Sequence, residues 1–112
     1  MNKSSLERVR AAAQFIGTQP EAVHLARPHL HPSVQQALDI LEQLLNGQWR
    51  TAEEIGEILG INRESTRQIL NALKWNPEDG GILLLSNGGN VKQSGWCLPN
   101  GKIVWKPGEN LR

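Results

Sequence analysis

Cysteine, long apolar runs and an excess of charge are all scarce in this chain of 112 residues. The single cysteine, Cys97, excludes a disulfide framework and leaves no pair of thiols for a zinc site. No segment approaches the roughly 20 apolar residues of a membrane span, and charged side chains interrupt residues 1–17, where a secretory signal would be apolar. We therefore expect a soluble cytoplasmic protein with one compact core.

Motifs of catalysis and of cofactor binding are also missing. The sequence has no phosphate-cradling glycine loop, no nucleophile elbow and no paired acid motif. Three histidines, His24, His29 and His31, could ligate zinc if their segment folded back, but no cysteine or carboxylate cluster accompanies them. Solvated loop histidines are the ordinary interpretation. We expect no enzyme, no metal and no cofactor.

The net charge of the chain is only +1, whereas proteins that grip nucleic acid need clustered lysine and arginine to meet phosphates. The charges are, however, unevenly distributed. Residues 33–61 carry five acids and one base, Arg50, whereas residues 62–106 carry six bases and three acids. The sequence therefore predicts a polarised molecule whose C-terminal half is net positive.

Helix starts are marked by Ser or Thr followed three residues later by Glu or Gln, a pattern that satisfies two backbone amides at once. Four such boxes begin at Ser4, Thr18, Ser33 and Thr51, and Asn62 offers a fifth cap. These signals predict five helices.

Apolar residues at helical spacing predict which side of each helix is buried. The first helix runs to about residue 16 and is ended by Gly17, the second is short because prolines interrupt it, and the third stops at Asn46 and Gly47. The expected buried positions are Leu6, Val9, Ala13 and Ile16 in the first helix, Val34, Leu38, Leu41 and Leu45 in the third, and Ile55, Ile58 and Leu59 in the fourth.

Only Gly60, Ile61 and Asn62 separate the fourth and fifth helices, and so short a linker forces two helices to cross steeply, as in a helix-turn-helix unit. Strand-like runs follow at 82–85, 91–98 and 102–106, and an Asn-Gly pair between the last two is typical of a tight hairpin. We expect these runs to form a three-stranded antiparallel sheet, with a turn or brief strand at 48–50.

The segments TAEEIGEILGINRESTRQILNAL and GGILLLSNGGNVKQSGWCL resemble the winged helix-turn-helix domains of bacterial and phage regulators, with Gly56 where alanine is usual. The resemblance implies an α+β, mainly α fold: a winged helix-turn-helix domain over residues 33–112, with a three-helix core and a C-terminal β-hairpin or three-stranded sheet. Residues 1–32 would form an N-terminal helical extension. The function it implies is sequence-specific binding of double-stranded DNA by a small transcriptional regulator.

The helix 63–74 is the candidate recognition helix. Its apolar residues gather on one side of a helical wheel, whereas polar groups that can pair with base edges gather on the other. Arginine pairs with guanine, glutamine and asparagine with adenine, and glutamate accepts from cytosine. We predict base contacts by Glu64, Ser65, Arg67, Gln68 and Asn71. The ordinary alternative is a solvated face on which Arg63 and Arg67 pair with Glu64.

Basic and amide side chains beside this face are expected to meet the DNA backbone. Arg63 and Lys74 flank the helix, and the loop 86–92 is the candidate wing. Within that wing the expected backbone contacts are Asn87, Asn90 and Lys92, for which a solvated hairpin tip is the alternative.

The four tryptophans suggest packing rather than base stacking. Trp96 and Trp105 are expected to face one another across the hairpin at 99–101, and Trp49 to pack before the turn. Trp75 would suit a partner surface if it is exposed. A rival hypothesis is therefore a winged-helix adaptor that binds protein and not specific DNA.

The apolar stripe of the N-terminal helices needs a cover, because a lone amphipathic helix is marginal in water. It packs either on the rest of the chain or on its copy in a second chain. We favour a homodimer, which would double a modest set of phosphate contacts.

Overall fold

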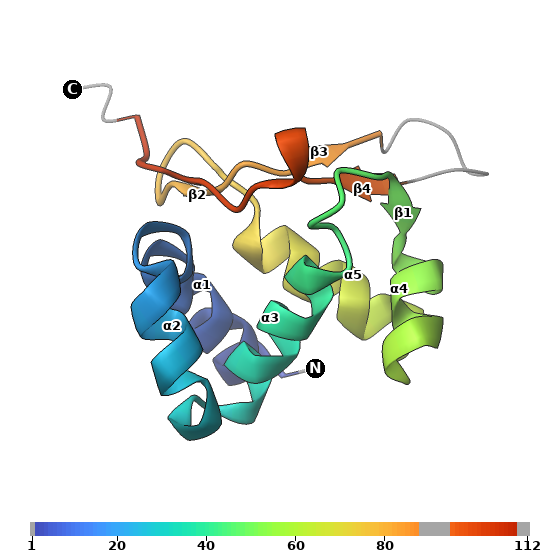
Figure 1. Cartoon of the computed structure of the whole chain (residues 1–112), viewed down its shortest axis with the longest axis horizontal. Helices are drawn as coiled ribbons and strands as arrows, with labels where there is room; N and C mark the ends of the chain where they lie inside the picture. The colour runs from blue at the N-terminus through green and yellow to red at the C-terminus, as the bar shows by residue number, and fades with distance from the viewer. Residues whose placement is uncertain (1, 88–94, 110–112) are drawn as a thin grey trace.

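The computed structural model describes residues 2–87 and 95–109 and has a mainly helical α+β fold, as the sequence predicted (Figure 1). The helices lie together, and the strands run across one side of them. The helices of the described residues are α1 (Lys3–Thr18), α2 (Pro20–Ala26), α3 (Pro32–Glu42), α4 (Ala52–Leu59) and α5 (Arg63–Leu73), with 3-10 turns η1 (Arg27–His29) and η2 (Pro99–Gly101). The strands are β1 (Arg50–Thr51), β2 (Gly81–Ile82), β3 (Leu85–Ser86), β4 (Gly95–Cys97) and β5 (Trp105–Lys106).

Two of the predicted helix caps are confirmed. Thr51 Oγ1 accepts from the Glu54 N–H at 3.0 Å, and Glu54 Oε1 accepts from the Thr51 N–H at 3.1 Å, so α4 begins with a complete capping box. Hydrogen bonding to Thr51 holds the pKa of Glu54 below its ordinary value. The backbone N–H of Thr51 is the larger cause and its side chain the second. Asn62 Oδ1 caps α5 by accepting from the Ser65 N–H at 2.7 Å.

The predicted caps Ser4, Thr18 and Ser33 are wrong. Asn2 caps α1 instead. Pro20 and Pro32 occupy the first turns of α2 and α3, where a missing N–H costs nothing. The N-cap of each helix is therefore the residue directly before its proline. For α3 that residue is His31, whose Nδ1 accepts from the Ser33 N–H at 3.1 Å. One of the predicted loop histidines therefore has a structural role.

Most of the predicted buried positions are confirmed, including Val9, Ala13, Ile16, Val34, Leu38, Leu41 and Ile55. Two are wrong. Leu45 is 45% exposed because α3 ends at Glu42 and the following turns bury Leu44 in its place. Ile58 is 52% exposed because it lies off the face of α4 that holds its buried residues Ala52, Ile55 and Gly56.

The N-terminal helices share one hydrophobic core with the helices that follow. α1 packs against both α3 and α5, and its buried side chains belong to the same cluster as those of α3 and α5. Arg27, just after α2, forms ion pairs with Asp39 and Glu42 of α3. The apolar stripe of α1, which could have packed on this chain or on a second copy, is thus covered within the chain.

The strands form two small antiparallel sheets, not the predicted single three-stranded sheet of residues 82–85, 91–98 and 102–106. One sheet has the order β1-β4-β3, and the other pairs β2 with β5. Leu85 lies opposite Cys97 and Ile82 opposite Trp105, so β4 and β5 follow one another along the same segment, residues 81–86. They do not pair with each other, and Trp96 does not face Trp105 across a hairpin.

The reason lies in the residues between β4 and β5. Asn100 and Gly101 have φ of 58° and 65°, as expected for an Asn-Gly turn. They form the 3-10 turn η2, after which the chain continues along residues 81–86 and does not fold back on β4. An amide of this turn, the Gly101 N–H, donates to the Leu98 carbonyl at 2.9 Å. The predicted turn chemistry is therefore present, while the predicted strand pairing across it is not.

The linker between α4 and α5 has the tight geometry that its length predicts. Gly60 ends α4 with a φ of 71°, and the Ile61 N–H donates to the Gly56 carbonyl at 2.9 Å. A Cβ on Gly56 would lie 2.4 Å from the Ile61 carbonyl oxygen and 3.3 Å from Thr66 Oγ1. Glycine at position 56 is therefore required by the close approach of the turn to its own helix.

Candidate nucleic-acid interface

The helix α5 has the two faces that the sequence predicts. Thr66, Ile69, Leu70 and Leu73 are fully buried, and the hydroxyl of Thr66 is satisfied by donating to the Asn62 carbonyl at 3.0 Å. The opposite side exposes Arg63, Glu64, Arg67 and Asn71. Ser65 and Gln68 are half-buried at the edges of that exposed side.

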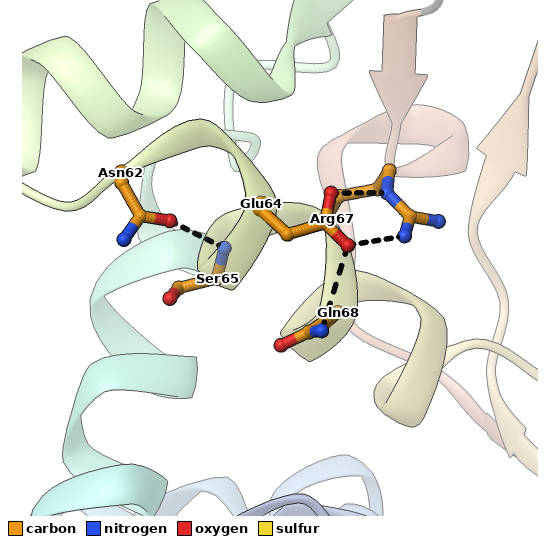
Figure 2. A network of polar contacts seen from close by, with 5 residues as sticks. All are labelled: Asn62, Glu64, Ser65, Arg67 and Gln68. Atoms are coloured by element: carbon orange, nitrogen blue, oxygen red, sulfur yellow. Dashed lines mark hydrogen bonds and ion pairs between the residues drawn. The ribbon is translucent and has the colours of Figure 1, made fainter. Parts of the chain in front are cut away.

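Glu64 and Arg67 are paired on the exposed face. Arg67 donates from Nε to Glu64 Oε2 at 3.1 Å and from Nη2 to Glu64 Oε1 at 2.5 Å (Figure 2). This hydrogen bonding, with the nearby charges of Arg67 and Arg63, lowers the pKa of Glu64, and the same bond raises the pKa of Arg67. Arg67 therefore forms the intrahelical ion pair with Glu64 that was the ordinary alternative to base contact.

Gln68 lies on the other side of the same carboxylate (Figure 2). Its Nε2 is 3.5 Å from Glu64 Oε1, while its Oε1 is buried and has no hydrogen-bond partner in residues 2–87 and 95–109. A bidentate contact with adenine needs both the amide nitrogen and the amide oxygen. Gln68 would have to rotate its side chain to make that contact.

A groove of about 330 Å³ separates the exposed face of α5 from the strands. One wall consists of Arg63, Arg67 and Asn71, three of the predicted DNA contacts. The other wall and the floor are formed by Ala52 at the start of α4, Ser86 of β3, and Gly95 and Trp96 of β4. The groove is therefore cationic on its α5 side, since both arginines border it.

Lys74, predicted to contact the backbone, is engaged within the chain. Its Nζ donates to Ser86 Oγ at 2.8 Å and lies 5.8 Å from the centre of the Trp96 ring. Both contacts join the end of α5 to the sheet. A phosphate at Lys74 would compete with Ser86 for this ammonium.

Of the predicted wing contacts, Asn87 holds the base of the loop. Its Oδ1 accepts from the Gly95 N–H at 2.6 Å, and its own N–H donates to the Gly95 carbonyl at 3.3 Å. Asn90 and Lys92 lie outside the described residues, as does most of the predicted wing at 86–92. The predictions for these two residues stay as predictions.

Sequence reasoning missed Ala52, Ser86 and Trp96 as parts of the groove. Trp96 was expected to pack against Trp105, and only the pairing of β4 with β1 and β3 turns its ring toward α5. The alternation of side chains along a strand could have shown that Trp96 and Cys97 face opposite sides. It could not have shown which side meets α5.

Comparison with known proteins finds no protein-family model, no curated protein and no solved structure that matches this chain. Over the described residues, no three His, Cys, Asp or Glu side chains are grouped to hold a metal ion. Nor does any helix in that part of the chain have the length and apolar character to cross a bilayer.

Proposed function

We propose that this chain is a sequence-specific double-stranded DNA-binding protein, a small transcriptional regulator with a winged helix-turn-helix domain. The order of elements supports the proposal: α3, β1, α4, the turn, α5, then β3 and β4 with the wing loop between them. In such a domain the second helix of the unit enters the major groove, and the wing lies on the backbone. Here these parts are the helix 63–74 and the loop 86–92.

The observation that carries the proposal is the cationic groove beside an exposed helix. Arg63, Arg67 and Asn71 lie along it, and their donors suit guanine, adenine and phosphate. The acids Glu53, Glu54 and Glu57 belong to α4 and do not line this groove. The polarised charge predicted from the sequence thus favours α5 as the DNA-facing element.

A homodimer fits this function, because two copies would double a small set of phosphate contacts and contact two half-sites. The interface would have to use a surface other than the apolar stripe of α1, which packs on α3 and α5. A palindromic target with half-sites about one DNA turn apart would indicate the dimer.

Selection of bound sequences from a random pool of DNA duplexes tests the proposal directly. We expect one motif to be enriched, and the affinity for it to fall as salt is raised because phosphate contacts release counterions. The double change Arg67→Ala with Gln68→Ala should abolish the enrichment. Affinity that is independent of salt, or an unchanged motif in the double variant, would contradict DNA recognition by α5.

A protein-binding adaptor is the second candidate, favoured by two exposed apolar side chains on the outer side of the sheet. Trp49 is 49% exposed and lies against Gly95, and Leu85 is 49% exposed opposite Cys97. Because Gly95 and Cys97 alternate with Trp96, both exposed side chains are on the sheet face away from the groove.

Trp75 suits a partner less well than the sequence suggested. Its indole N–H donates to the Pro107 carbonyl at 3.0 Å, and Lys106 Nζ lies 4.5 Å from the centre of its ring. A displayed peptide library therefore tests the adaptor through Trp49. Peptides enriched by the wild type and lost with Trp49→Ala, without any enriched duplex, would favour the adaptor over the regulator.

A further inference from the structure

The ion pair with Glu64 uses one edge of the Arg67 guanidinium, and a second edge takes no part in that pair. A guanidinium has five N–H donors in a rigid, planar arrangement. Nε and Nη2 form one edge, and this edge donates to the two oxygens of Glu64 at 3.1 and 2.5 Å. In the part of the chain that the structure describes, these are the hydrogen bonds that Arg67 makes within the fold.

The end edge, formed by Nη1 and Nη2, carries two parallel N–H groups. That geometry matches O6 and N7 of guanine, the commonest specific contact in the major groove. Arg67 also lines the groove beside β3 and β4, so the guanidinium is held at the surface where a duplex would lie. A long side chain fixed in this way loses less conformational freedom when it binds.

Glu64 affects Gln68 in the opposite sense. The carboxylate lies near Nε2 of Gln68, and the amide oxygen of Gln68 is buried (Figure 2). The two neighbours of one carboxylate therefore differ: Arg67 keeps a complete recognition edge at the surface, and Gln68 does not. A carboxylate on the DNA-facing side also repels the phosphates of any duplex, and only a site with the matching base offsets that repulsion through its contact with Arg67.

We propose that Glu64 is a positioning residue that presents the end edge of Arg67 to a guanine, so that Arg67, and not Gln68, determines the base preference of α5. This inference rests on the proposed DNA-binding function and assigns Glu64 a role other than contact with cytosine. It predicts guanine at one position of the selected motif in each half-site.

The test is Glu64→Gln, which keeps the shape of the side chain and removes its charge. The ratio of affinity for the selected duplex to affinity for a scrambled duplex should fall about tenfold, within the range that one bidentate pair contributes. Affinity for the scrambled duplex should rise. Unchanged circular dichroism would show that α5 stays folded.

Glu57→Gln is the matched control, because Glu57 is exposed on α4 and its substitution changes the net charge equally. It should raise affinity for both duplexes alike and leave their ratio unchanged. Glu64→Gln made together with Arg67→Ala should lower the ratio no further than Arg67→Ala alone, since the two residues act as a unit. A salt titration of each variant separates phosphate contacts from base contacts.

The outcomes separate this inference from the function on which it rests. If the wild type discriminates between duplexes and Glu64→Gln keeps the same ratio as Glu57→Gln, the positioning role is wrong and DNA recognition stands. A motif without guanine, or one lost with Gln68→Ala alone, would also overturn it. If the wild type enriches no duplex, both the function and the inference fall.

Discussion

The two faces of α5 differ in what holds their side chains in place. The inner face, with Thr66, Ile69 and Leu70, is fully buried in the common core and contacts other helices. The outer face is held by bonds within α5 itself, above all the pair of Glu64 and Arg67. The inner face therefore contributes most of the stability of α5, and substitutions on the exposed outer face should weaken the fold little.

The largest difference between the faces should appear on truncation. Leu70→Ala should lower the free energy of unfolding by about 2–5 kcal/mol, because a buried leucine leaves a cavity in the core that α1, α3 and α5 share. Arg67→Ala should leave the unfolding midpoint essentially unchanged, because exposed positions contribute little. Urea unfolding followed by circular dichroism measures both, and equal losses would remove the distinction.

Gly56 of α4 lies close to the turn that leads to the buried face of α5, and a substitution at this position should break that contact. Gly56→Ala should destabilise the fold by about 1–3 kcal/mol, because the added methyl meets the Ile61 carbonyl oxygen and the chain must shift. Gly60→Ala is the matched control. Position 60 has open space around it but a φ of 71°, so its loss should be about 1 kcal/mol and due to backbone strain alone. A larger loss at Gly60 than at Gly56 would contradict the steric argument.

The capping box at the start of α4 has a smaller expected effect. Thr51→Ala should destabilise by about 1 kcal/mol, since it removes the side-chain acceptor of the Glu54 amide. Thr18→Ala should have less effect, because no side-chain cap is present at the start of α2. Thermal unfolding of the two variants in parallel would check the difference, and a greater loss at Thr18 would contradict the caps described above.

The smallest expected effect concerns pH and the outer face. The pKa of Glu64 is lowered in the folded chain from its ordinary value of 4.5, so its contribution to stability is present above that pH and is lost as the pH falls through the folded-state pKa. The stability difference between wild type and Glu64→Gln should therefore be constant near neutrality and shrink below about pH 4.5. Urea midpoints from pH 7 to pH 3 measure it. A difference that grows in acid would reverse the sign and exclude the pairing with Arg67.

Local signals along the chain predicted the helical part of the molecule well. The capping box at Thr51, the cap at Asn62 and the buried face of α5 depend on neighbours within a few residues, and all three are confirmed. The caps of α2 and α3 were missed although the decisive residues, Pro20 and Pro32, are also local. The preference of proline for the first helical turn outweighs the Ser or Thr signal there.

Contacts between distant segments explain the remaining differences. No local pattern shows that η2 interrupts the line of β4 and β5, or that Trp96 closes a groove against α5. The burial of the Gln68 amide oxygen likewise depends on side-chain orientation and surrounding packing, while a helical wheel places this residue on the outer side. Such features depend on strand register and side-chain packing, which a single strand or helix does not determine.

The sequence by itself determined α4, α5 and the short turn between them, because glycine, caps and apolar spacing act over a few residues of backbone. It also determined that the groups able to meet a base or a phosphate are concentrated after Asn62. Only the tertiary structure decided that α1 belongs to the core and that Arg63, Arg67 and Asn71 share a groove with β3 and β4. The physical reason is that the stable partner of an apolar or polar face is chosen by packing among all the elements at once.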